Sequence, residues 1–163
     1  MTTTQEPKDK SCPPDISYNH ARMIAATYRL GQSLLRQTLK DSEIPVAKAD
    51  FIRVVSHCPG ITQSELADLM LVSKPSVAQA VKELERKGYL YRKTDEADRR
   101  VRHLYPTEKS EQAMSLLDAA FERLIVLHCK VLSEKENAAF SVLLEKSAAA
   151  LREALGDEER GRR

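Results

Sequence analysis

The fold of this chain is decided by one stretch of sequence, VSKPSVAQAVKELERKGYL, which runs from Val72 to Leu90. At 100° per residue, the spacing of Val77, Val81 and Leu84 places three apolar side chains on one face of a helix. The opposite face carries a small polar to basic row, formed by Pro75, Gln79, Lys82 and Arg86. This pattern predicts a helix that packs on a core through one face. The other face meets either water alone or a binding partner.

Helix-capping signals divide the surrounding sequence into short elements. Thr62 and Glu65 have the spacing of a capping box, and Ser73 is placed as the N-cap of a second helix. Gly88 follows that helix as its C′ residue. Two capped helices joined by a tight turn form a helix-turn-helix, and its second helix is predicted over Ser73 to Lys87.

A small β wing is predicted directly after the second helix. Residues 90–93 and 101–105 have the pattern of short strands, and they flank the polar loop TDEADRR. A hairpin in this position after a helix-turn-helix is a wing. A charged row lies at its tip and just beyond it, formed by Asp98, Arg99, Arg100 and Arg102.

Further helices are predicted on both sides of this core. One follows the N-cap candidate Asp15, another covers about residues 46–57, and two more follow Thr107 and the capping box of Ser133 with Glu136. The fold class is therefore mostly α with a small β wing. The predicted divisions are a flexible arm over 1–14, a single unit over 15–156 with a winged helix-turn-helix core at 46–107 and flanking helices at 15–45 and 108–156, and a charged tail over 157–163.

The flanking helices predict a homodimer. They carry long apolar stripes, whereas the winged core between them is already a closed unit. Helices with such faces need a partner to bury them. We therefore expect an obligate homodimer formed by residues 15–45 and 108–156.

Positive charge is concentrated in one part of a nearly neutral chain. The 163 residues include 26 Lys and Arg against 24 Asp and Glu, which gives a formal net charge of +2. Nine of these basic residues and five of the acidic ones lie between Ser73 and His103, so this segment alone carries +4. A local basic cluster is typical of a surface that binds nucleic acid.

The composition argues against several other classes of protein. Cys12, Cys58 and Cys129 are odd in number and lack CxxC spacing, which argues against a disulfide framework or a zinc site. The last two fall in helical patterns and are expected to be small core residues. No apolar run approaches the roughly 20 residues of a membrane span, so a cytoplasmic protein is expected. Common enzyme signatures are absent, and we expect neither catalysis nor a cofactor.

The segment from Gly60 to Thr107 resembles the winged helix-turn-helix core of the MarR (multiple antibiotic resistance regulator) family. Four patterns carry the resemblance: T-Q-x-x-L-A in the first helix, V-S before the second, L-x-x-x-G-[YL]-[LI]-x-R at its end, and D-x-R in the wing. The residues that match them are Thr62, Gln63, Leu66, Ala67, Val72, Ser73, Leu84, Gly88, Tyr89, Leu90, Arg92, Asp98 and Arg100. The flanking helices match only in layout, and Ser110 stands where the family usually has Gly.

The resemblance implies a dimeric transcriptional regulator that binds double-stranded DNA at a pseudo-palindromic operator, with the second helix in a major groove. Gln79 is the expected base reader, because its amide can pair bidentately with adenine, while Lys82 and Arg86 suit phosphates. Asp98 is expected to brace Arg100 for the minor groove. The alternatives are a solvated helix face and an ordinary polar hairpin. The full set of expected DNA contacts is Ser73, Lys74, Pro75, Ser76, Gln79, Lys82, Arg86, Asp98, Arg99, Arg100 and Arg102.

A ligand site is expected beside the first long helix. Its apolar stripe is interrupted by His20 and Thr27, and His57 ends the next helix. In family members that respond to phenolic or carboxylate compounds, these elements line a cleft between the dimerisation helices and the winged domain. The resemblance thus implies a repressor that a small aromatic acid or phenol releases from DNA. A hydrogen-bonded core or interface histidine is the alternative for both His20 and His57.

Two other functions remain open at this stage. Cys12 precedes a Pro pair, where an accessible thiol would suit a redox-responsive regulator, although KSCPPD lacks the apolar setting of the family's peroxide sensors. The winged helix would also suit a protein-interaction adaptor. An adaptor does not require Lys82, Arg86 and Arg100 to face one surface, so the basic row favours DNA.

Overall fold

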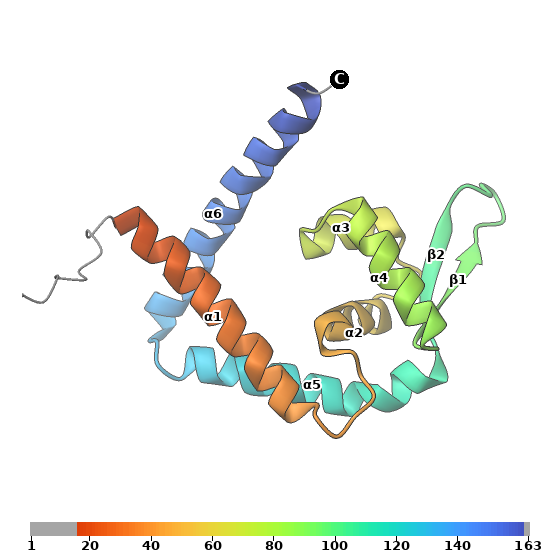
Figure 1. Ribbon diagram of the computed structural model, residues 1–163, viewed down its shortest axis with the longest axis horizontal. Helices are drawn as coiled ribbons and strands as arrows, with labels where there is room; N and C mark the ends of the chain where they lie inside the picture. The colour runs from red at the N-terminus through yellow and green to blue at the C-terminus, as the bar shows by residue number, and fades with distance from the viewer. Residues whose placement is uncertain (1–15, 162–163) are drawn as a thin grey trace, which may run out of the picture. The chain divides into compact units, whose positions relative to one another are not determined.

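The computed structural model describes residues 16–161, which are mostly helical with one two-stranded antiparallel sheet, as predicted (Figure 1). The chain divides into two units, one up to residue 114 and one from residue 115. The elements in chain order are α1 (Ile16–Thr38), the 3₁₀ turn η1 (Val46–Lys48), α2 (Ala49–His57), α3 (Gln63–Met70), α4 (Lys74–Arg86), β1 (Leu90–Thr94), β2 (Arg102–Pro106), α5 (Glu108–Cys129) and α6 (Glu134–Gly161).

The helix-turn-helix is formed by α3 and α4, and both helices begin at the predicted caps. The Glu65 N–H donates to Thr62 Oγ1 at 3.2 Å, and the Thr62 N–H donates to the Glu65 carboxylate at 2.8 Å. Ser73 Oγ accepts a bond from the Ser76 N–H at 3.3 Å, which begins α4. These bonds satisfy backbone groups that helix ends leave without partners, and they set the residue at which each helix begins.

The turn between the two helices passes through a left-handed residue. Leu71 has a φ of 57°, and it is the one non-glycine residue with positive φ among residues 16–161. Its N–H bonds to the carbonyls of Ala67 and Asp68, which closes α3. A left-handed backbone costs about 1 to 2 kcal/mol for a residue with a Cβ, so surrounding structure must hold this tight turn in place.

The wing is attached to the segment that leads into α3. β1 and β2 pair in antiparallel register, with Arg92 opposite Leu104. The Gly60 N–H donates to the Leu104 carbonyl at 2.8 Å, and the Leu104 N–H donates to the Ile61 carbonyl at 2.9 Å. Both strands lie within one residue of the predicted ranges. These bonds fix the wing on the same loop that starts the helix-turn-helix.

The core of the first unit is built mainly from side chains of α2, α3, α4 and the wing strands. α4 contributes Val77, Val81 and Leu84, which have no exposed surface. Each fully buried aliphatic side chain stabilises a fold by roughly 1.5 to 3 kcal/mol. Other fully buried members are Ile52 and Val55 of α2, Leu66 of α3 and Leu104 of β2. The apolar stripe predicted for the second helix is therefore the face that packs in the core.

In the second unit, α6 begins at the predicted capping box. The Ser133 N–H donates to the Glu136 carboxylate at 2.8 Å, and the Glu136 N–H donates to Ser133 Oγ at 3.4 Å. α6 leaves Leu143, Leu151 and Leu155 between 63% and 66% exposed in the single chain. Across residues 16–161, no helix combines the length and the apolar character needed to cross a membrane.

Three details differ from the sequence-based expectations. The helix expected over about residues 46–57 is divided, because Lys48 has φ −121° and ψ 3°, outside the helical region, so that α2 starts after a 3₁₀ turn. Cys58 and Cys129 are exposed and are not core residues. Both cysteines stand at the C-terminal ends of helices. At a helix end, the spacing of apolar residues no longer indicates which side chains are buried. α6 also continues to Gly161, inside the segment expected to be a tail.

Candidate nucleic-acid interface

The polar row of α4 is exposed along the helix, and it does not overlap with the buried face. Its exposed members are Lys74, Pro75, Ser76, Gln79, Lys82 and Arg86. At the start of α4 the hydroxyl oxygens of Ser73 and Ser76 lie 2.8 Å apart. Ser73 Oγ also accepts the capping bond. Part of the hydrogen-bonding capacity of these two hydroxyls is therefore already used within the helix start. Gln79, Lys82 and the residues near them have open access to a partner.

The wing holds Arg100 in the way that the D-x-R pattern predicts. Nε and Nη2 of Arg100 donate to the two carboxylate oxygens of Asp98, both at 3.1 Å, and the Arg100 N–H donates to Asp98 Oδ1 at 2.9 Å. The bonds from Arg100 lower the pKa of the Asp98 carboxyl, and the carboxylate raises the pKa of the guanidinium. The Arg100 side chain is nevertheless 91% exposed, so the brace leaves it open to a partner.

Asp95 shapes the loop that carries this pair. Its Oδ1 atom accepts bonds from the N–H groups of Ala97 and Asp98, each at 2.8 Å. Together with a bond from His103, these backbone bonds lower the pKa of the Asp95 carboxyl. Asp95 therefore positions the backbone of Asp98, and Asp98 in turn positions Arg100.

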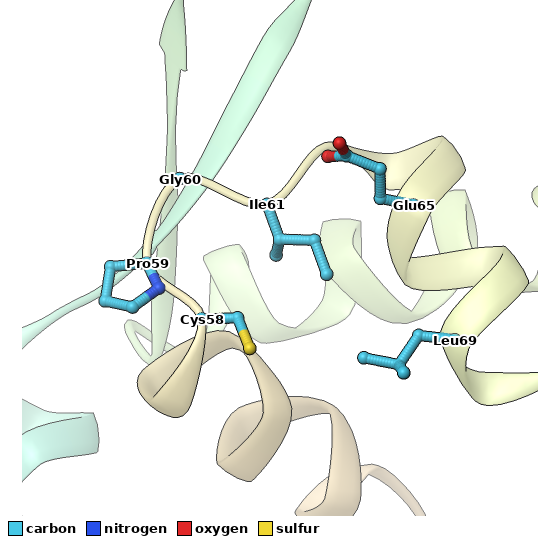
Figure 2. A pocket seen from close by; sticks show the side chains of 6 residues that line it. All are labelled: Cys58, Pro59, Gly60, Ile61, Glu65 and Leu69. Atoms are coloured by element: carbon cyan, nitrogen blue, oxygen red, sulfur yellow. The ribbon is translucent and has the colours of Figure 1, made fainter.

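His103 connects the same loop to the body of the helix-turn-helix. Its Nδ1 atom lies 2.6 Å from the Gly60 carbonyl oxygen, and its Nε2 atom lies 3.1 Å from Asp95 Oδ2. The bond to Gly60 and the bond to Asp95 raise the pKa of the imidazole. Figure 2 shows the loop of Pro59, Gly60 and Ile61 beside the wing strands, to which it is hydrogen-bonded.

Three arginines of the wing line a pocket at the start of α3. It has a volume of about 460 Å³ and is lined by Thr62, Gln63, Ser64, Arg92, Arg100, Val101 and Arg102. The N-terminus of a helix carries positive partial charge, and the guanidinium groups add formal positive charge. The pocket is therefore suited to an anion with several oxygen acceptors, such as a phosphate.

Arg92 contributes to this pocket while it is paired with α4. Its Nε atom donates to Glu85 Oε1 at 2.6 Å, and Nη2 donates to the second carboxylate oxygen. The bonds to Glu85 raise the pKa of Arg92. The pair ties β1 to α4 and offsets one positive charge of the interface. Asp98 likewise offsets the charge of Arg100, whose side chain nevertheless stays 91% exposed.

Some members of this surface were not predicted from the sequence. Gln63 and Arg92 were identified only as residues that match family patterns, and Ser64 was not singled out. The available signal was the capping box itself, because a helix N-terminus attracts anions. This helix start lies beside the wing because Thr62 and His103 form an isolated antiparallel β-bridge. No local sequence pattern indicates that pairing.

The residues predicted to bind a ligand are not gathered around one described pocket. His20 is exposed on α1, Thr27 is half-buried one heptad later, and His57 is exposed at the end of α2. A pocket of about 490 Å³ lies between the end of α2 and α3, and Figure 2 shows the side chains that line it. It includes none of the three, although Cys58 follows His57 directly. Their ligand role stays a prediction, and Cys12 lies outside the described residues.

Comparison with known proteins finds transcriptional regulators among the proteins to which this chain is similar. A model of the MarR family matches residues 42–101. The chain is similar, at 26% identity over 125 residues, to the uncharacterized HTH-type transcriptional regulator YybA of Bacillus subtilis strain 168. That match covers 77% of this chain and 83% of YybA.

Two solved structures share the fold. A putative MarR family transcriptional regulator from Listeria monocytogenes, complexed with 26mer DNA, has a TM-score of 0.77 and 21% identity, over 86% of this chain and 94% of that one. A MarR mutant from E. coli, complexed with operator DNA, has a TM-score of 0.71 and 20% identity, over 84% of this chain and 99% of that one. The winged helix-turn-helix architecture is therefore shared with proteins whose structures contain DNA.

Proposed function

We propose that this chain is a MarR-family transcriptional regulator and that it is a homodimeric repressor of a pseudo-palindromic operator. We further propose that a small aromatic acid or phenol releases it from DNA. Each winged helix reads one half-site, and the two-fold symmetry of the dimer is repeated in the operator.

One observation carries the DNA-binding part of the proposal. Arg92, Arg100 and Arg102 line a single pocket together with Thr62, Gln63 and Ser64 at the start of α3. Three guanidinium groups at a helix start favour phosphate oxygens, which supply most of the affinity of proteins for DNA. A surface for docking another protein has no comparable need for this convergence of positive charge.

The exposed row of α4 gives the proposed interface its sequence preference. Gln79 stands in the middle of the exposed face, where its amide can pair with an adenine edge. Lys82 and Arg86 follow one and two turns later and suit phosphates. Ser73, Lys74 and Ser76 lie at the positive end of the helix, nearest the backbone of the duplex.

The dimer part of the proposal is supported by apolar side chains without cover in the single chain. α1 exposes Met23, Ile24 and Leu30 between 47% and 71%, and α6 exposes Leu151 and Leu155 at about two thirds. Leaving this much apolar surface of two long helices exposed to water is unfavourable in free energy. A second copy of the chain offers the same apolar faces in return, as a two-fold interface requires.

The effector part of the proposal is supported by polar groups within one apolar stripe. His20 and Thr27 are seven residues apart on α1, which places them on one side of that helix, with Met23 and Ile24 between them. A mainly apolar site with one or two polar groups suits a ring that bears a carboxylate or a hydroxyl. Such a ligand weakens DNA binding when it prefers a dimer whose recognition helices are wrongly spaced.

Selection from a library of duplexes with a randomised centre tests the DNA-binding proposal. We expect enrichment of one sequence with two related half-sites about 10 bp apart. Binding to that selected duplex is then compared with binding to a scrambled duplex by fluorescence anisotropy. The double variant Lys82→Ala, Arg100→Ala serves as the matched control. Failure to enrich any sequence, or equal affinity of the wild type and the double variant, would contradict the proposal.

A further inference from the structure

His103 lies between two groups that both accept hydrogen bonds. One of its ring nitrogens faces the Gly60 carbonyl oxygen, and the other faces the Asp95 carboxylate. A carbonyl oxygen can only accept. The Asp95 carboxyl is also ionised at neutral pH, because its backbone bonds and His103 lower its pKa. Neither partner of the imidazole can therefore donate a hydrogen to it.

This arrangement distinguishes the two charge states of the ring. A neutral imidazole carries one N–H and can make only one of the two bonds, while the imidazolium carries two and makes both. Loss of the proton leaves one ring nitrogen with its lone pair directed at an oxygen. Either the Gly60 contact or the Asp95 contact must then open.

We propose that His103 is a positioning residue whose imidazolium form clamps the wing loop to the segment before α3, so that affinity for DNA falls as His103 loses its proton. This inference rests on the proposed function, because DNA affinity is its outward effect. The clamp itself is a property of the chain alone.

The clamp reaches the wing tip through a short series of bonds. Asp95 uses Oδ2 to bind His103, and it uses Oδ1 to hold the N–H groups of Ala97 and Asp98. Asp98 then braces Arg100 through its own carboxylate. Release of the bond between His103 and Asp95 frees the first member of this series and loosens the loop that presents Arg100.

The sign of the pH dependence follows from the direction of the shift. The bond to Gly60, followed by the bond to Asp95, raises the pKa of His103 above its ordinary value. The stabilisation by the clamp is therefore fully present below the unfolded pKa of about 6.5, and it is lost as pH rises through the higher folded value. Acidification through the raised pKa of His103 therefore tightens the wing.

Two carboxylates act on His103 within the described chain. Asp95 belongs to the loop between the strands, and Glu65 belongs to α3. Glu65 is held in place by the backbone and hydroxyl of Thr62, and this capping box lowers its pKa. Both carboxylates therefore stay charged over the range in which His103 titrates, and the change belongs to the imidazole.

The first arm of the test uses the protein without DNA. Nitrogen NMR of the full chain, labelled in its histidine rings, follows both ring nitrogens between pH 5 and pH 9. We expect His103 to lose its proton above the usual pKa of about 6.5, with the N–H resonances of Ala97 and Asp98 moving at the same midpoint. In His103→Gln this movement should vanish, while in His128→Gln, which changes an exposed histidine of α5, it should remain.

The second arm measures anisotropy with the selected duplex at constant ionic strength across the same pH range. The wild type and His128→Gln should lose about two- to tenfold more affinity than His103→Gln as pH rises, the range that one net hydrogen bond supports. Equal pH slopes for wild type and His103→Gln, or a His103 midpoint at or below 6.5, would overturn the inference. A clamp seen by NMR in a chain that binds no duplex would overturn the proposed function and leave the clamp standing.

Discussion

Asp98 holds Arg100 through three hydrogen bonds, because its carboxylate accepts two from the guanidinium and one from the backbone N–H of Arg100. An exposed arginine normally has much rotamer freedom to lose when it is ordered. Here part of that freedom is lost when the wing folds. The cost of ordering Arg100 against a partner is therefore smaller, and such preorganisation increases affinity without any additional contact.

The brace predicts different outcomes for two variants. Arg100→Ala should weaken binding to every duplex by at least about tenfold, because it removes charged donors. Asp98→Asn keeps the guanidinium but removes the charge that holds it, and it should weaken binding by roughly threefold. Anisotropy with the selected and scrambled duplexes measures both effects. Lys135→Ala, at an exposed position of α6, controls for charge. Unchanged affinity in Asp98→Asn would show that the brace has no role in binding.

Gln79 and Lys82 should respond to substitution in different ways. Gln79→Ala should reduce discrimination at one base pair by roughly 1 to 3 kcal/mol and change little on scrambled DNA. Lys82→Ala should weaken binding to all sequences and reduce the slope of log K against log salt by about one unit. Affinity for a set of single-base operator variants, measured at several salt concentrations, separates the two. An equal loss on every sequence for Gln79→Ala would remove its base-reading role.

Ser110 is predicted to contribute to stability although it departs from the family pattern. Its side chain has no exposed surface, and its hydroxyl donates to the Tyr89 carbonyl. Ser110→Ala should lower the free energy of unfolding by about 1 kcal/mol, since that carbonyl still accepts bonds from Thr107. Ser110→Gly should cost about 1 kcal/mol more, because the position is in the first turn of α5. Urea unfolding checks this, with exposed Ser115→Ala as the control. A Gly variant as stable as wild type would refute it.

The apolar face of α6 should be needed for dimerisation. Leu151→Glu and Leu155→Glu place a charge where the proposed interface excludes water, and the double variant should sediment as a monomer at micromolar concentration. The exposed substitution Glu153→Ala, on the same helix, should leave the dimer intact. Sedimentation velocity measures both. A wild-type monomer, or a double variant that remains dimeric, would exclude this interface.

A small aromatic acid should bind the wild-type protein and oppose DNA binding. Calorimetric titration of small aromatic acids and phenols is expected to give weaker binding to His20→Ala than to wild type. By linkage, the selected duplex should reduce ligand affinity by the same factor, about 5- to 150-fold, by which the ligand reduces DNA affinity. His128→Gln serves as the histidine control. If the wild type and His20→Ala bind the ligand with equal affinity, His20 has a structural role and no role in ligand binding. If the ligand binds with equal affinity in the presence and absence of DNA, that compound is excluded as an effector.

The elements encoded by nearby residues were predictable. The capping box of Thr62 with Glu65, the N-cap Ser73 and the brace of Asp98 on Arg100 all join residues two or three positions apart. Spacing along the chain is sufficient to place the two caps, while the brace was expected from the D-x-R pattern that the segment shares with the MarR family. This explains why both helix starts and the wing were located to within about a residue.

Contacts between distant residues were not predictable in the same way. His103 and Gly60 are 43 positions apart, and their bond exists only because the wing returns to the loop before α3. The pairing of Arg92 with Glu85 depends similarly on how β1 leaves α4 around Gly88. Leu71 adopts a left-handed conformation that residue type alone argues against. Tertiary packing decided each of these cases.

The separation of the two faces of α4 has a consequence for how proteins with this fold diversify. The buried face consists of Val77, Ala80, Val81 and Leu84, while the polar row that we assign to DNA is exposed on the remaining positions. Mutations at Gln79 or Ser76 therefore leave the packing of the domain untouched. Under the proposed function, copies that arise by gene duplication can change operator through substitutions in the polar row without altering the buried face. Selection on recognition and selection on folding act on separate residues of a single helix.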